Sequence, residues 1–194
     1  MSTSPRARKR CAWARNPLCA AYHDREWGVP VRSDRKLFEF LILEGAQAGL
    51  AWNTILAKRA SYRRAFDRFD AATIARYGAR ERRRLLADAG IVRNRAKIDA
   101  AIVNAQRFLQ LQKEFGSFSK YVWGFVGGAP LQGRRRRPAD VPSRTGISDA
   151  LARDLKKRGF KFVGTTIMYA FMQAVGMVND HTRDCFRHRE LARR

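Results

Sequence analysis

The chain has 194 residues, which is enough for one domain with a sizeable hydrophobic core. Its 40 lysines and arginines against 17 acidic residues give a formal charge of +23, so DNA or RNA is the first partner to consider. Three scattered cysteines argue against a disulfide-rich secreted protein, and no apolar run approaches the roughly 20 residues of a membrane span. The cysteines suit a reducing cytoplasm, where thiols stay free to bind a metal.

The first ten residues form a basic arm that we expect to be disordered. No apolar segment follows their four basic side chains, so the arm is not a secretory signal. Residues 11–32 are expected to be irregular, and they are rich in aromatic and ligand-capable side chains: Cys11, Trp13, Cys19, Tyr22, His23 and Trp27.

A helix capped by Asp34 and ending near Glu44 carries the first candidate site. Leu37, Leu41 and Glu44 recur at steps of three and four residues, which places Glu44 on the leucine face, pointing inward. A carboxylate among apolar side chains is costly unless something pairs with it.

The residues after Glu44 leave two interpretations open. We expect Gly45 and Gly49 to break the helix and a second helix to run from about Trp52 to Phe66. Glu44 is then either the floor of a pocket for a flat, polar, cationic guest, or a cap for the N-terminus of the second helix.

Two further helical patterns lie between Glu81 and Leu111, separated by the turn Asp88–Val92. Such a turn can present backbone N–H groups to a phosphate, and Arg93, Arg95 and Lys97 follow it. An ordinary connection between helices is the alternative.

The clearest loop runs from Gly127 to Gly146 and contains Arg134–Arg137. Four successive arginines repel one another and do not enter a core, so they form a solvated loop or contact phosphates. The loop follows a short helix within Phe115–Gly128.

Two helices complete the chain, one capped by Ser148 and ending at Gly159, the other running from about Gly164 to Val178. No convincing run of strands is present, so the predicted fold class is all-α.

His181 and Cys185 are spaced as two zinc ligands on one turn would be. The alternative is that this spacing arose by chance, because His-x-x-x-Cys by itself is a weak signal of a zinc site. Further ligands could come from Cys11, Cys19, His23 or His188. A site with four protein ligands would leave no position for water, and so would be structural.

Several motifs, in the same order along the chain, resemble the 3-methyladenine DNA glycosylase I family of the helix-hairpin-helix glycosylase superfamily. The resemblance covers nearly all of Cys11 to Cys185. The motifs are Cys11–Trp13, Tyr22–Pro30, Leu43–Trp52, Asp88–Arg93, Leu155–Thr166 and Val178–His181.

The resemblance implies an all-α, helix-hairpin-helix glycosylase-like bundle in a single domain, residues 11–187. Residues 11–32 and 160–187 would form a lobe joined by one structural Zn²⁺, residues 33–159 a helical lobe with the hairpin at 88–92, and residues 188–194 a basic tail. The implied zinc ligands are Cys11, His23, His181 and Cys185.

The resemblance also implies the roles of the site residues. Glu44 would be the acid that recognises the base, with Tyr22, Trp52 and Trp13 as aromatic walls. Gly49 and Leu50 would press into the DNA stack, while Gly90, Ile91 and Arg93 would grip the backbone.

The implied activity is hydrolysis of the N-glycosidic bond of 3-methyladenine in alkylated double-stranded DNA, after the base is flipped into the pocket. No lysine nucleophile is expected, so the enzyme would lack lyase activity. The resemblance further implies a monomer in the cytoplasm of a bacterium, without membrane association.

One alternative is a zinc-stabilised, non-catalytic DNA-binding protein. Another is a glycosylase of shifted alkyl-lesion preference, suggested by Cys19, where relatives often carry an aromatic residue.

Overall fold

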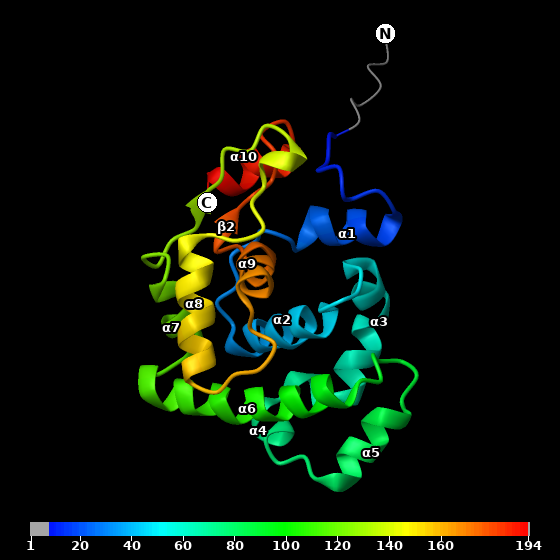
Figure 1. Cartoon of the computed structure of the whole chain (residues 1–194). Coiled ribbons are helices and arrows are strands. Elements are labelled where there is room, and N and C mark those ends of the chain that lie inside the picture. The colour runs from blue at the N-terminus through cyan, green and yellow to red at the C-terminus, as the bar shows by residue number, and fades with distance from the viewer. Residues whose placement is uncertain (1–7, 194) are drawn as a thin grey trace.

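The computed structural model describes residues 8–193, and this part of the chain is mostly helical (Figure 1). The prediction of a helical fold is confirmed, apart from two short strands. The helices are α1 (Pro17–Arg25), α2 (Asp34–Gln47), α3 (Trp52–Ala65), η1 (Asp67–Phe69), α4 (Ala71–Ile74), α5 (Ala79–Ala87), α6 (Arg95–Phe115), α7 (Phe118–Gly124), η2 (Pro138–Asp140), α8 (Gly146–Lys157), α9 (Thr165–Ala174) and α10 (Phe186–Ala192). The strands are β1 (Leu131–Gln132) and β2 (Val178–Asn179), which pair in parallel.

Helix α2 runs through the centre of the molecule, with α6 crossing on one side of it and α9 on the other (Figure 1). Residues 37–46 of α2 are all buried, because α3, α6, α7 and α9 pack around the helix. Phe38 meets Phe108 of α6 at a ring-centroid distance of 4.8 Å, and Phe108 meets Phe118 of α7 at 4.6 Å. Glu44 is buried on this central helix, as its spacing predicts.

Both predicted ends of α2 need correction. Ser33, not Asp34, occupies the N-cap position. The carboxylate of Asp34 instead accepts backbone N–H bonds from Phe118 and Ser119 at 2.8 Å each, which satisfies free donors at the start of α7.

At its other end α2 continues through Gly45 to Gln47. A Cβ at Gly45 would lie 3.3 Å from the Cβ of Phe162, so this glycine allows close packing and does not break the helix. Gly49 does stand outside the helix, with a φ of +76° in the loop before α3.

The segment predicted to be irregular, residues 11–32, contains helix α1. The side chain of Asn16 caps this helix by accepting the N–H of Cys19 at 2.8 Å, and Pro17 occupies the first turn.

Helix α9 ends at Ala174, four residues before the predicted end at Val178. Gly176, with a φ of +73°, turns the chain against Val29, where a Cβ would lie 2.4 Å from the Val29 carbonyl carbon. Val178 then pairs with Leu131, which gives the two strands absent from the prediction.

Two other differences concern α8 and the C-terminus. Thr145 caps α8, and the predicted cap Ser148 is the third helical residue. Helix α10 extends from Phe186 into the predicted basic tail, residues 188–194. Residues 1–7 of the predicted basic arm lie outside the described residues, while Arg10 forms a 2.8 Å ion pair with Asp24. Within residues 8–193, no helix is long and apolar enough to cross a membrane.

Candidate functional site

A cavity of about 380 Å³ lies beside the C-terminal end of α2. The N-terminal segment, helices α1, α2, α3 and α9, and the loop at 138–141 enclose it. Its volume is in the range of small-molecule sites. The lining residues are Cys11, Ala12, Trp13, Tyr22, Trp27, Glu44, Gln47, Trp52, Pro138, Val141, Ala170, Gln173, Asp180 and Thr182.

Glu44 is 4% exposed at the wall of this cavity. Within residues 8–193, no hydrogen bond or ion pair engages its carboxyl group, and burial alone raises the pKa of Glu44 from 4.5 to about 8. Helix α3 has no side-chain cap, so the interpretation of Glu44 as a cap is wrong. The carboxyl group lines the cavity and has no partner in the part of the chain that the structure describes.

Aromatic rings surround this carboxyl group. The rings of Tyr22 and Trp52 lie 5.5 Å apart, and those of Trp13 and Trp27 meet edge-on at 5.1 Å. The buried hydroxyl of Tyr22 also lacks a hydrogen-bond partner among the described residues. Burial, followed by the proximity of Glu44, raises the pKa of Tyr22. Buried polar groups are nearly always hydrogen-bonded, so these two groups indicate a site that a polar ligand completes.

The cavity brings together the predicted site residues Glu44, Tyr22, Trp52 and Trp13. Four further residues line the cavity that were not predicted from the sequence to do so: Trp27, Gln47, Gln173 and Asp180. Trp27, Gln47 and Asp180 belong to the motifs that carry the family resemblance, and this membership is the signal that could have identified them; Gln173 lies outside those motifs.

Asp180 is the second carboxylate of the cavity, and its environment is the opposite of that of Glu44. Its oxygens accept hydrogen bonds from Arg135 Nε at 2.9 Å, from Gln173 Nε2 at 3.1 Å and from the Tyr169 hydroxyl. Arg135 balances the charge of Asp180, whereas among the described residues Glu44 has no such ion pair.

Cys19 lies in the hydrophobic core, where its Sγ is 3.6 Å from Asn53 Oδ1. Cys19 does not line the cavity.

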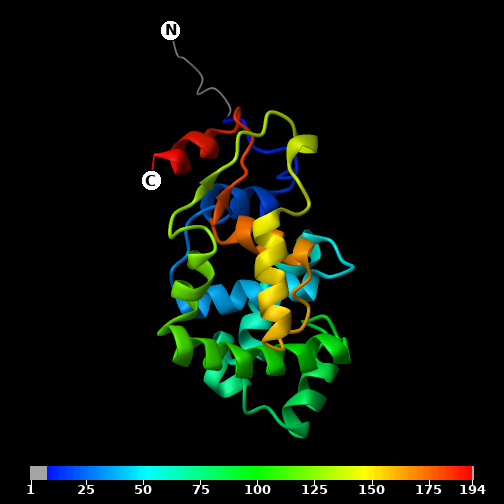
Figure 2. The same cartoon turned by 60° about the vertical axis from the view of Figure 1, so that its left-hand side comes forward.

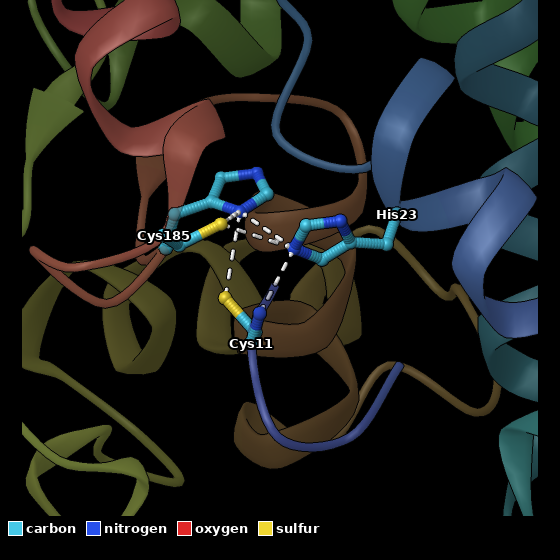
Figure 3. A group of neighbouring side chains, drawn as sticks. Cys11, His23 and Cys185 are labelled. Carbon is cyan, nitrogen blue, oxygen red and sulfur yellow. Dashed lines mark hydrogen bonds between the residues drawn. The ribbon is translucent and has the colours of Figure 1, made fainter. Parts of the chain in front are cut away.

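Cys11, His23, His181 and Cys185 form a buried cluster whose ligand atoms all lie within 4.8 Å of one another (Figure 3). Cys19 and His188, the other candidates, are outside it. His181 Nδ1 lies 3.5 Å from each of the two sulfurs and 3.2 Å from His23 Nε2. Cys185 Sγ lies 3.3 Å from His23 Nε2. A tetrahedral zinc with nitrogen and sulfur ligands separates them by about 3.3–3.8 Å, so the cluster fits such an ion.

The surroundings of the cluster support this fit. His23 Nδ1 lies 2.8 Å from Asp24 Oδ1, and His181 Nε2 lies 3.1 Å from the carbonyl oxygen of Trp27. Outer partners of this kind orient the nitrogen of a histidine ligand toward a metal. Hydrogen bonds from Cys11 and both imidazoles lower the pKa of Cys185, whereas the Cys185 contact and burial raise the pKa of Cys11. A buried Cys₂His₂ group that could hold a metal ion therefore joins the two ends of the chain.

The loop between α2 and α3 presents Leu50, which is 40% exposed and among the few exposed large apolar side chains. Lys97 Nζ holds the loop by donating to the carbonyl oxygens of Ala46 at 2.8 Å and Ala48 at 2.6 Å. An apolar side chain is thus exposed beside the cavity on a tethered loop.

The turn between α5 and α6 packs against α3. A Cβ at Gly90 would lie 2.8 Å from the Cβ of Ser61, so the close approach requires glycine. Ile91 is 2% exposed as a whole residue and therefore offers a partner almost no surface, whereas Arg93 is exposed. Of the three residues predicted to grip DNA, Arg93 alone presents its side chain to solvent.

Comparison with known proteins adds the following findings. Residues 12–188 match the family model described as methyladenine glycosylase. The chain is 49% identical over 178 residues to DNA-3-methyladenine glycosylase 1 of Escherichia coli K12, covering 91% of this chain and 95% of that protein. It is 44% identical over 177 residues to DNA-3-methyladenine glycosylase of Haemophilus influenzae, covering 91% and 96%. A solved structure of 3-methyladenine DNA glycosylase I from Staphylococcus aureus, determined to explain how that enzyme recognises 3-methyladenine, is also similar to this chain. The two structures superimpose with a TM-score of 0.89 at 35% identity, covering 91% of this chain and 95% of the other.

Proposed function

The chain belongs to the methyladenine glycosylase family, and from that premise we propose that it removes 3-methyladenine from alkylated DNA in base-excision repair. The reaction is hydrolysis of the N-glycosidic bond between the damaged base and deoxyribose.

The observation that carries this proposal is the carboxyl group of Glu44, which lines an aromatic cavity and has no partner within residues 8–193. An N3-methylated adenine in DNA is flat and positively charged, and its exocyclic amine donates hydrogen bonds. Such a base gives Glu44 both a charge partner and a donor. Tyr22 and Trp52 can stack on the cationic ring, where cation–π attraction contributes roughly 0.5–2 kcal/mol.

The positive charge of the damaged base also determines which steps of the reaction the residues of the cavity have to assist. The base leaves as a neutral molecule, so its departure needs little help from a general acid. The residues therefore bind and orient an extruded nucleotide, whose unstacking costs a few kcal/mol. Among the described residues no lysine lines the cavity, which supports hydrolysis without strand cleavage.

We further propose that the Cys₂His₂ cluster holds one Zn²⁺ through Cys11, His23, His181 and Cys185. With four protein ligands the ion has no open position, so it would act only as a structural cross-link between the N- and C-terminal segments. Cys11 and Thr182, next to the ligand His181, also line the cavity, so the cross-link would hold one of its walls in place.

For DNA binding, the proposal assigns a wedge role to Leu50 on the loop at Gly49, and backbone contacts to the helix-hairpin-helix turn with Gly90, Ile91 and Arg93. The exposure of Leu50 and Arg93 supports these roles. That the protein acts as a monomer in the bacterial cytoplasm stays a prediction.

The test is release of methylated bases from alkylated DNA by wild-type protein and by Glu44→Gln. Loss of a hydrogen bond to a charged group corresponds to a rate loss of roughly 10- to 150-fold. Glu114→Gln is the matched control, because the Glu114 side chain is 52% exposed and does not line the cavity. Absence of any released base with wild-type protein would favour the non-catalytic DNA-binding alternative, and preferential release of 7-methylguanine would favour a shifted lesion preference.

A further inference from the structure

The segment Arg134–Arg137 follows β1, and hydrogen bonds hold it against β2 and against a residue between the two C-terminal members of the Cys₂His₂ cluster. The N–H of Gly133 donates to the carbonyl oxygen of Asn179 at 2.9 Å, and the carbonyl oxygen of Arg135 accepts the N–H of Arg183 at 2.8 Å. A Cβ at Gly133 would lie 2.3 Å from Asp180 Oδ1, so the two segments are in close contact. A merely solvated loop does not require such anchoring.

The four arginines divide into two pairs. Arg135 turns inward to Asp180, and Arg137 forms a 3.0 Å ion pair with Asp140. The carboxylate of Asp140 also accepts the backbone N–H groups of Arg136 at 3.2 Å and Arg137 at 2.9 Å. Arg134 and Arg136 are exposed, and no ion pair within residues 8–193 engages either side chain. Among the described residues, these two guanidinium groups are therefore without an ion pair and are carried on a fixed backbone.

Arg134 and Arg136 lie close in the chain to residues that line the cavity. Pro138 and Val141, which follow directly in the chain, line the cavity, so the arginine segment lies at its rim. In Figure 2 the loop carrying η2, the loop between α2 and α3, and the turn between α5 and α6 lie along one edge of the molecule. The segment Arg134–Arg137 thus leads directly into the loop with η2, which shares this edge with the other two connections.

We propose that Arg134 and Arg136 bind phosphates of the damaged strand beside the extruded nucleotide. This inference rests on the proposed glycosylase function, because the cavity must hold a base still attached to its strand. Arginine binds phosphate through two parallel hydrogen bonds, and a fixed backbone reduces the entropy lost on binding. The segment would then be a DNA contact separate from the Leu50 loop and the turn Asp88–Val92.

The test compares Arg134→Ala/Arg136→Ala with Arg189→Ala/Arg193→Ala. The second pair removes the same charge, and both its arginines are exposed and without an ion pair in the described part of the chain. Helix α10, which carries Arg189, lies at the opposite edge of the molecule in Figure 2. Equal melting temperatures would show that neither pair alters the fold. The first measurement is the salt dependence of the affinity for a DNA duplex that contains an abasic-site analogue. The second is the kcat and KM for 3-methyladenine release, and the third is the affinity for free 3-methyladenine.

Loss of two phosphate contacts lowers the slope of log K against log salt by about 2 and raises KM. We expect this for Arg134→Ala/Arg136→Ala only, with kcat and free-base binding unchanged. Slopes and KM values equal in both variants would overturn the proposal. If wild-type protein releases no base, the proposed function fails, yet the salt slopes still decide whether these arginines contact DNA.

Discussion

Replacing Glu44 by glutamine should make the stability of the protein far less dependent on pH. Glu44 lies in the core with no partner among the described residues, and burial raises its pKa from 4.5 to about 8. Glutamine has a similar shape but does not titrate, so the variant isolates the contribution of this single ionisation.

The sign follows from the proton balance. Between pH 4.5 and pH 8 the folded protein keeps a proton on Glu44 that the unfolded chain has released. The folded state therefore binds more protons, and the free energy of unfolding falls as pH rises through this window. With these two pKa values, wild-type protein should lose about 4 kcal/mol relative to Glu44→Gln between about pH 5 and pH 9.

The assay is urea unfolding of both proteins at several pH values, with equal metal content and linear extrapolation to water. All other titrating groups are shared, so they cancel in the difference between the two proteins. The variant should gain relative stability steadily up to about pH 8 and then no further. Parallel stability curves would show that Glu44 is solvated or paired in the folded protein, which would refute the reasoning.

Three further outcomes are expected. Since a cationic base favours ionised Glu44, kcat/KM for 3-methyladenine excision should rise with pH to about 8 in wild-type protein and stay flat in Glu44→Gln; a flat wild-type profile would contradict this. Cys185→Ser should lose zinc and melt at a lower temperature, whereas Cys19→Ser should keep its metal because Cys19 is outside the cluster; elemental analysis with thermal melting decides, and a fully metal-loaded Cys185→Ser would argue against this ligand. Gly133→Ala should lower the melting temperature, because its Cβ would lie 2.3 Å from Asp180 Oδ1 and 2.7 Å from the Asn179 carbonyl oxygen; an unchanged melting temperature would mean that the two segments separate at little cost.

Features that depend on near neighbours in the chain could be predicted from the sequence. The spacing of Leu37, Leu41 and Glu44 is enough to bury Glu44, because helix geometry fixes which side chains share a face. The helices around the turn Asp88–Val92 were also predictable, since their apolar periodicity and the glycine between them are local signals.

Gly45 and Asp34 show where local signals mislead. The helix continues through Gly45 because Phe162, more than a hundred residues later, packs where a side chain would be. Asp34 is a good capping residue, but it caps α7 and not its own helix. In both cases a distant segment supplies the partner, and local propensity contains no information about it.

The tertiary structure alone decided which of the two cavity carboxyl groups is free. Glu44 and Asp180 are both buried in the folded protein, so burial does not distinguish them. Folding brings Arg135 to Asp180, whereas within residues 8–193 no cation pairs with Glu44, so the desolvation of Asp180 is compensated and that of Glu44 is not. Electrostatic interactions depend on distance in space, which the order of residues along the chain does not fix.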